Sequence, residues 1–434
     1  MKKLGSIFLS LLLCGFYCAP AARAQSGTND LAHLTIYNAG IGEFLEEREV
    51  ELQTGLNSLE WRSLMPKAYI RTVRVVAADA EVVRQDVTYD GAQVNNERSP
   101  VLHLVIQNRG AAGRRKVQVD YLAPGISWKS DYALVLEPTA SGAPPTAAML
   151  DSWVTLYNNT GADLLAGKVD LVAGEISLLT DDGSGGSQYT SQSQSYSTNV
   201  VSLDGTNAEM SEGSYAEVTN LSAFNRFALG DNLSLNANAI INRFPIFQRA
   251  RLAIVQRNVF ENSHDTQTLG RGGFILLPRG LEVRLVAKNT ASAPLAAGLV
   301  TIYQRSTSGL AQIVGQDRIA FTPQGGEFSV SQGRSATLFG TRRVLERRVI
   351  NYRDKNNESR DKLVTNIEVV ISNRGALAAE AFVRESIERY DDNQWKITES
   401  SPVDGERLGA NTVQFKVNVP AGGKTTIVYT VENE

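Results

Sequence analysis

Apolar and polar residues alternate along most of this chain, and a period of two residues is typical of strands that bury one face. Helical periodicity is scarce, and the segment 233–241 fits a helix and a strand equally well. The sequence therefore predicts an all-β protein with little helix. The clearest alternating segments are 33–37, 49–52, 72–76, 117–121, 281–286, 301–303, 367–371 and 412–419.

A strand–Asn–strand pattern recurs five times. In each copy an alternating strand ends in Asn, turn residues follow, and a second alternating strand starts a few residues later. We interpret these asparagines as reversal points, because Asn and Gly accept left-handed backbone angles. The copies lack one fixed period, which favours tandem β-sandwich modules of immunoglobulin or fibronectin type over a solenoid or propeller. The five asparagines are Asn38, Asn108, Asn158, Asn289 and Asn373.

The segment Tyr121–Leu136, YLAPGISWKSDYALVL, places Trp128 and Tyr132 four residues apart after a Pro-Gly turn. Alternate residues of a strand share a face. We therefore expect Trp128 to pack between sheets, with its indole N–H bonded to an acceptor. The alternative is an exposed aromatic platform that binds a ligand. The face that contains Trp128 is mostly apolar and consists of Ile126, Trp128, Ser130, Tyr132, Leu134 and Leu136.

The first residues have the three parts of a secretory signal peptide. Two lysines form a positive start, an apolar run covers 4–17, and Ala-Arg-Ala at 22–24 is a small-x-small cleavage site. The apolar run is shorter than the roughly 20 residues that span a bilayer, although an uncleaved anchor is the alternative. We expect residues 1–24 to be removed, the mature chain to start at Gln25, and the protein to be periplasmic or extracellular in a bacterium.

Removal of the signal would also change the chemistry of the chain. Both cysteines, Cys14 and Cys18, lie within it, so the exported chain would have no disulfide, thiolate nucleophile or cysteine metal ligand. Three positive charges would go as well, and the formal net charge would change from −3 to −6. A mildly acidic chain argues against nucleic acid as a partner. No second apolar run is long enough to span a membrane.

Composition suggests three modules after the signal, covering residues 25–96, 97–265 and 266–434. We read 90–100 as a linker after the first module. Residues 181–215, rich in Gly, Ser and Gln, are expected to form a flexible loop, because they cannot bury enough apolar surface to offset the ordering entropy.

Few residues suggest chemistry. The three histidines are His33 and His103, in predicted strands, and His264, in a polar loop. A metal site needs three or four ligands, and 181–183 lacks the alternating acidic ligands of a calcium loop. The sequence contains no metalloprotease, nucleophile-elbow, phosphate-loop or dinucleotide motif. We therefore assign no catalytic, cofactor-binding or metal-binding residue and expect no cofactor.

Carboxylates are numerous but dispersed. The adjacent pairs Glu46–Glu47 and Asp391–Asp392 do not converge, because neighbours on a strand point to opposite faces. A catalytic carboxylate pair brought together from distant strands would not be visible in the sequence. An envelope glycan or peptide hydrolase therefore stays the alternative function.

The run 342–362, RRVLERRVINYRDKNNESRDK, mixes charges of both signs. It predicts two edge strands around a turn at Asn356-Asn357, with the charges discouraging contact with other sheet edges. A docking surface is the alternative interpretation.

Several segments resemble a family of exported bacterial proteins of unknown function, some of which are labelled mucoidy inhibitor A homologues. The resemblance is collinear over most of the chain after residue 24 but rests on diffuse motifs, and 89–102 lacks the insertion of longer relatives. It implies an exported, all-β protein without an established enzymatic activity. The segments that carry it are 34–61, 121–136, 152–176, 298–325, 367–375 and 415–431.

We accordingly expect a non-enzymatic protein that binds an envelope protein or polysaccharide. A polysaccharide is favoured if Trp or Tyr side chains line one exposed sheet face.

Overall fold

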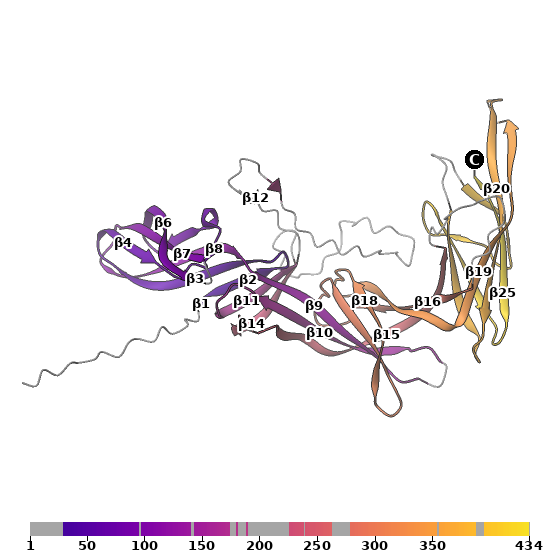
Figure 1. The fold of residues 1–434 in the computed structure, drawn as a ribbon, viewed down its shortest axis with the longest axis horizontal. Coiled ribbons are helices and arrows are strands. Elements are labelled where there is room, and N and C mark those ends of the chain that lie inside the picture. The colour runs from indigo at the N-terminus through magenta and orange to yellow at the C-terminus, as the bar shows by residue number, and fades with distance from the viewer. Residues whose placement is uncertain are drawn as a thin grey trace, which may run out of the picture.

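The structure is a computed structural model, and the parts of it described below form a chain of β-sheets, as the alternating pattern predicts (Figure 1). Its single helical element, within the described ranges, is the 3-10 helix Ile70–Thr72. The signal peptide 1–24, most of the loop 181–215, His264 and Asp391–Asp392 lie outside the described residues. The described ranges are 29–94, 97–139, 143–173, 179–180, 188–189, 225–237, 239–262, 278–353, 356–387 and 395–433.

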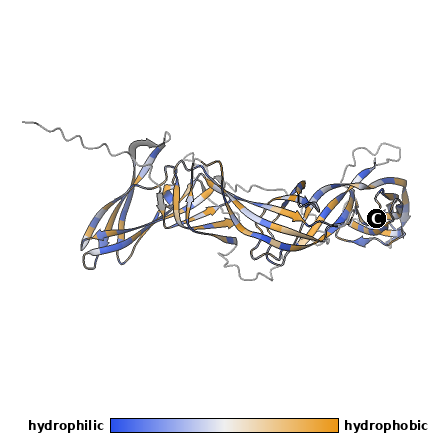
Figure 2. Cartoon of the chain, turned by 90° about the horizontal axis from the view of Figure 1, so that it is seen from below, coloured by the Kyte–Doolittle hydropathy of each residue, from blue (hydrophilic) through white to orange (hydrophobic). Residues whose placement is uncertain are grey.

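The strands form sheets of thirteen, seven, three and two strands. Hydrophobic and hydrophilic residues alternate along them (Figure 2). In chain order the strands are β1 (Asn29–Leu31), β2 (His33–Tyr37), β3 (Ile41–Leu52), β4 (Gly55–Trp61), β5 (Arg74–Ala77), β6 (Glu81–Val94), β7 (Glu97–Asn108), β8 (Gly113–Pro124), β9 (Ile126–Leu136), β10 (Ala147–Asn158), β11 (Leu164–Ala173), β12 (Leu179–Thr180), β13 (Gln188–Tyr189), β14 (Asn225–Leu235), β15 (Asn242–Asn262), β16 (Arg279–Lys288), β17 (Gly298–Arg305), β18 (Ala311–Ile319), β19 (Glu327–Arg353), β20 (Ser359–Asn373), β21 (Ala379–Ser386), β22 (Trp395–Ser401), β23 (Glu406–Arg407), β24 (Thr412–Val419) and β25 (Lys424–Asn433).

Four units repeat the same strand pairing. In each unit two antiparallel pairs are joined by two corners, at which the chain leaves one pair and enters the other. The first unit pairs β4 with β7 and β3 with β8, and the second pairs β10 with β15 and β11 with β14. The third pairs β16 with β19 and β17 with β18, and the fourth pairs β20 with β25 and β21 with β24. The arrangement is sandwich-like, whereas the immunoglobulin or fibronectin type stays a prediction.

A buried asparagine links the two corners of every unit. Its side-chain N–H donates to the backbone of its own corner and to a carbonyl of the opposite corner, and its Oδ1 accepts the backbone N–H two residues later. In the fourth unit Asn373 donates to Leu377 O at 2.8 Å and Val419 O at 3.2 Å, and accepts from Gly375 N at 2.8 Å. The equivalent asparagines are Asn108, Asn158 and Asn289.

These contacts correct the reason given for the Asn pattern. Left-handed angles occur in the described chain at other residues, Asn357 among them, and not at the four corner asparagines. The corners need a small amide that serves three buried backbone groups at once. The fifth asparagine, Asn38, is exposed and belongs to no such link.

Three clusters of buried side chains fill the units. The first cluster is shared by the first and second units, the second cluster lies mainly in the third unit with residues of β10 and β15, and the third lies mainly in the fourth unit with residues of β15, β16 and β19. Strand β9 joins two of these cores, because Trp128 lies in the first cluster and Tyr132 in the cluster of the third unit. Adjacent units are therefore connected by shared strands.

Trp128 faces the core, as predicted, with 4% of its surface exposed. Its ring packs edge-on against Phe227, with ring centroids 6.0 Å apart. The predicted partner of the indole N–H is wrong, since Nε1 is buried with no acceptor among the described residues. Phe227 comes from a strand a hundred residues away, and its ring edge supplies no acceptor atom.

The predicted linker at 90–100 is also wrong. Strand β6 continues to Val94, β7 starts at Glu97, and the two pair as a hairpin. The division expected between residues 96 and 97 thus falls between two strands that pair with each other inside the first unit.

Candidate functional site

The outer face of strands β9, β10 and β15 carries the candidate site. Strand β10 buries Leu150, Val154 and Leu156, so its alternate residues Trp153 and Tyr157 point to the opposite face and are half-buried. We call this surface the aromatic face. It consists of Trp153 and Tyr157 with the neighbouring side chains of Lys129, Asp131 and Arg243.

Sheet register places a charged group beside each aromatic ring. Trp153 pairs with Asp131 on β9, and its ring lies 4.9 Å from the Arg243 guanidinium. The Lys129 ammonium is 5.7 Å from the ring of Tyr157. Cations at these distances are attracted to the aromatic quadrupole and limit the movement of the ring. The carboxylate of Asp131 is fixed too, because Thr155 donates to it at 2.6 Å.

The two rings have a spacing that suits an extended ligand. They are four residues apart on one strand, which corresponds to about 13 Å. A ring surface next to a carboxylate and a cation matches the chemistry of a sugar, which has an apolar face and a rim of hydroxyl groups. The aromatic face therefore has the features of a glycan-binding surface.

This surface also holds a carboxylate pair. Asp151 pairs with Ala133 and Asp131 pairs with Trp153, so the two aspartates are diagonal neighbours on one face. Such neighbours have Cα atoms roughly 7–8 Å apart. Asp151 accepts the backbone N–H of Arg249 at 2.6 Å. Under the hydrolase alternative, Asp131 and Asp151 are the candidate catalytic carboxylates of the aromatic face.

A second pair of carboxylates lines a cavity of about 200 Å³ between β15 of the second unit and strands β16 and β19 of the third. Glu261 and Glu282 both accept from Arg284, at 3.3 and 3.0 Å. Burial favours the neutral form of Glu282, but the hydrogen bond and charge of Arg284 outweigh it and lower the pKa of that carboxyl. A general acid for glycoside hydrolysis needs a raised pKa, so this pair is a structural ion cluster.

The two histidines in the described chain lie in strands β2 and β7, as predicted. The structure brings His33 to Asp170, 137 residues away, with Nε2 2.6 Å from Oδ2. The same oxygen lies 2.6 Å from Arg226. His103 contacts Thr88 at 2.8 Å. The Arg226 charge satisfies Asp170, and we interpret the His33 cluster as a tie between β2, β11 and β14.

Glu46 and Glu47 point to opposite faces, as predicted. Glu47 pairs with Lys116 at 2.6 Å on the outside. Glu46 is 2% exposed and accepts from Trp61 Nε1 at 2.7 Å and Tyr121 OH at 3.1 Å, and also from Ser63. Burial, followed by the negative charge of Glu46, raises the pKa of Tyr121 well above its usual value. Because the oxygen atoms of Glu46 already accept these hydrogen bonds, we interpret Glu46 as a structural residue of the first cluster.

Searches of known proteins add no identity. No protein-family model matches the chain, and no curated protein matches it. In the described residues no group of three or more His, Cys, Asp or Glu side chains is placed to hold a metal ion. The same part of the chain contains no helix with the length and apolar character that a membrane crossing requires.

Sequence reasoning missed the aromatic face for a physical reason. The alternating pattern of β10 places Trp153 and Tyr157 on one face, but the sequence does not show which strands flank it. Arg243 lies 90 residues from Trp153 and reaches it because β15 pairs with β10. The sequence does contain one usable signal: Trp153 and Tyr157 are four residues apart, and they alternate with the apolar Leu and Val residues of the same strand.

Proposed function

We propose that this chain is an exported binding protein of the bacterial envelope that holds a polysaccharide on its aromatic face. The observation that carries the proposal is the pair Trp153 and Tyr157, half-buried on one sheet face and each beside a cation. The export signal at 1–24 supplies the compartment in this proposal. The resemblance to exported proteins of unknown function agrees with a binding role.

The expected mode of binding is stacking of sugar rings on Trp153 and Tyr157. Asp131, Lys129 and Arg243 would hydrogen-bond to hydroxyl or acidic groups at the edges of those rings. A surface of this kind would bind along a polysaccharide chain, because both rings lie on the same strand.

The first prediction concerns Trp153→Ala. We expect this variant to bind purified envelope polysaccharide at least about tenfold more weakly than the unaltered protein in isothermal titration calorimetry, since a central aromatic commonly contributes about 2 kcal/mol or more. Tyr89→Ala is the matched control, because Tyr89 is 57% exposed on a different sheet. Equal affinity of the Trp153→Ala variant and the unaltered protein would exclude this face as the site.

The hydrolase alternative rests on the diagonal pair Asp131 and Asp151. It predicts that new reducing ends appear when the protein is incubated with the same polysaccharide, and that Asp131→Asn with Asp151→Asn abolishes them. Binding without the release of reducing ends favours the binding role.

A further inference from the structure

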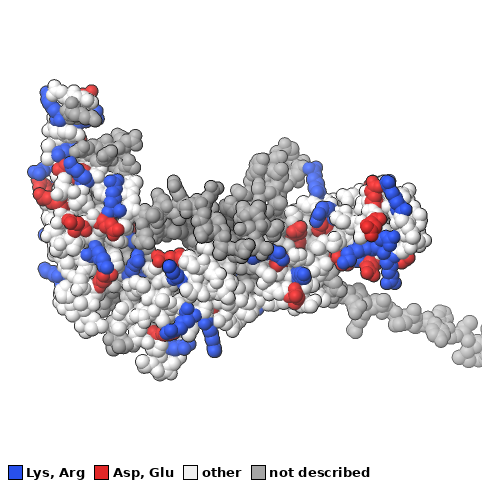
Figure 3. All heavy atoms as spheres, turned by 180° about the vertical axis from the view of Figure 1, so that it is seen from behind, with Lys and Arg blue, Asp and Glu red and all other residues white. Residues whose placement is uncertain are grey.

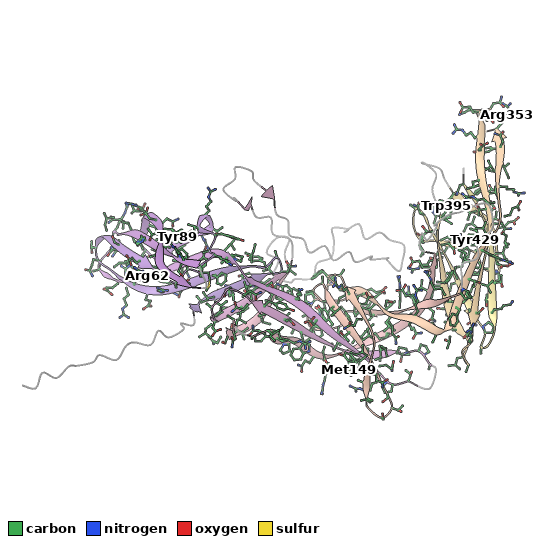
Figure 4. All side chains as sticks on the ribbon, viewed as in Figure 1. Arg62, Tyr89, Met149, Arg353, Trp395 and Tyr429 are labelled. Carbon is green, nitrogen blue, oxygen red and sulfur yellow. The ribbon has the colours of Figure 1, made fainter. Side chains whose placement is uncertain are left out.

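The long strand β19 extends beyond the sheet that it begins in. It pairs with β16 from Glu327 to Gly340, and Gly340 lies opposite Arg279, the first residue of β16. It pairs with β20 from Leu338 to Arg353. Residues 341–353 are therefore paired along one edge by β20, while the other edge has no strand partner in the described chain. We call the hairpin of 341–363 the arm and this edge of β19 the free edge (Figures 1 and 4).

The base of the arm is fixed to the fourth unit. Arg342 points into the core and donates to Glu385 at 2.7 Å, and the Tyr429 hydroxyl donates to the same carboxylate oxygen at 2.7 Å. Glu385 is fully buried. Arg343, on the opposite face, holds Glu368 through two hydrogen bonds of 2.6 and 3.1 Å. These contacts set the direction of the arm and hold its edge in an extended form.

The free edge is rich in arginine. Residues 341–353 contain five arginines and one acidic residue, Glu346. Two of the arginines are held at the base, and the register with β20 places Arg347, Arg348 and Arg353 on the outer part of the arm, with Arg353 at its end (Figure 4). Basic and acidic side chains lie side by side on this part of the molecule (Figure 3), and Arg348 is 3.8 Å from Glu346. Val349 is 65% exposed among them.

A bulge divides the edge. The register shifts between Val344 and Glu346, after which residues 346–353 continue in regular register with β20. Bulges twist an edge locally and limit pairing across it. The eight residues from Glu346 to Arg353 therefore form the segment that a further strand can follow, which is long enough for an ordinary strand.

We propose that the free edge of the arm binds an extended acidic segment of a partner protein by strand addition. An unpaired edge offers backbone N–H and C=O groups for main-chain pairing. Arginines suit carboxylates, since their planar donors bind both oxygens. A second copy of this chain is a poorer match, because the segment 346–353 offers one carboxylate, Glu346, against three arginines.

The experiment uses the exported chain and a ten-residue peptide of alternating Glu and Val as the probe. We expect saturable binding that slows hydrogen exchange at alternate amides of residues 346–353. A peptide of alternating Lys and Val is the charge control and should not bind. Arg347→Glu should weaken the affinity for the acidic peptide at least about tenfold, whereas Arg114→Glu, an exposed arginine of the first unit, should leave it unchanged.

Three outcomes would overturn the proposal. One is the absence of exchange protection in 346–353 when the acidic peptide is saturating. Another is equal binding of both peptides. The third is that polygalacturonate, an acidic polysaccharide, displaces the acidic peptide from the Trp153→Ala variant without protecting these amides, which would assign the edge to a polymer. Use of the Trp153→Ala variant separates this readout from binding at the aromatic face.

Discussion

The corner asparagines show how one side chain can stabilise a whole strand connection. Each replaces backbone partners that a buried corner would otherwise lack, and each joins two segments distant in sequence, such as Asn158 and Leu235. Buried backbone groups without partners cost about 1–3 kcal/mol each. We infer that Asn is required at these positions by the hydrogen bonds of the corner and not by a left-handed backbone angle.

Substitution of Asn373 tests this at a single position. Asn373→Ala should lower the free energy of unfolding by about 2–4 kcal/mol, because it leaves buried carbonyls of the two corners and the N–H of Gly375 without partners. Denaturant melts provide the measurement. Asn38→Ala is the matched control, since Asn38 has the same sequence pattern but is exposed, and should change stability by less than about 0.5 kcal/mol. Similar effects for the two variants would contradict the role of the corner.

Trp128 answers the question that its segment raises, and the answer can be measured. Trp128→Ala should destabilise the protein by roughly 3 kcal/mol, the lower end of the range for a buried aromatic. The cost is at the lower end because the substitution also removes a buried N–H without an acceptor, which is itself unfavourable. Trp128→Phe should cost clearly less than Trp128→Ala. Lys129→Ala, on the opposite face, should cost well under about 1 kcal/mol. A negligible effect of Trp128→Ala in thermal and denaturant melts would show that the ring is exposed.

Single residues also mark where sequence reasoning works. Alternation predicts that Trp128 faces the core and that Glu46 and Glu47 point to opposite faces, because side-chain direction in a strand follows from position. It does not reveal the neighbours of Glu46, since Trp61 and Tyr121 reach it from other strands and Ser63 from the loop after β4. For the same reason, the sequence does not show that the indole N–H of Trp128 lacks an acceptor.

At the scale of elements, the run 342–362 behaves as its charges predict. It forms a hairpin, and Asn357 at the turn has a φ of 66°, the left-handed angle expected of Asn there. The sequence does not predict that β19 starts at Glu327, because nothing in its pattern separates the part shared with the third unit from the arm. Strand pairing over long sequence distances decides that boundary.

The base of the arm has a pH dependence that follows from Tyr429. Burial, followed by the negative charge of Glu385, raises the pKa of Tyr429 well above 10. The unfolded chain therefore releases this proton first, so Tyr429 contributes to a fall in stability as the pH rises above about 10. Urea melts between pH 8 and pH 11 should show a shallower fall for Tyr429→Phe than for the unaltered protein. Parallel curves would show that Tyr429 ionises in the folded state.

At the scale of the whole molecule, composition suggests three modules, whereas the part of the chain that the structure describes contains four repeated units. The difference arises because units share strands and cores. A sequence boundary needs a polar linker, and here β9 extends from one core to the next with Ser130 and Ser152 between them as small polar residues. The all-β class was predictable from periodicity, whereas the number of units depends on pairings between distant segments.

Strand β15 connects the aromatic face to the base of the arm. It carries Arg243 of the aromatic face near its start, and at its end Asn262 pairs with Glu385, which holds the base of the arm. Nineteen residues of strand separate the two points, which is at most about 60 Å along the chain, and the register shifts opposite β10 and the left-handed Arg249 bend the strand within that length. One continuous strand thus connects the two proposed sites. A polysaccharide and a protein bound at the same time would be held on a single paired element, with no linker between them.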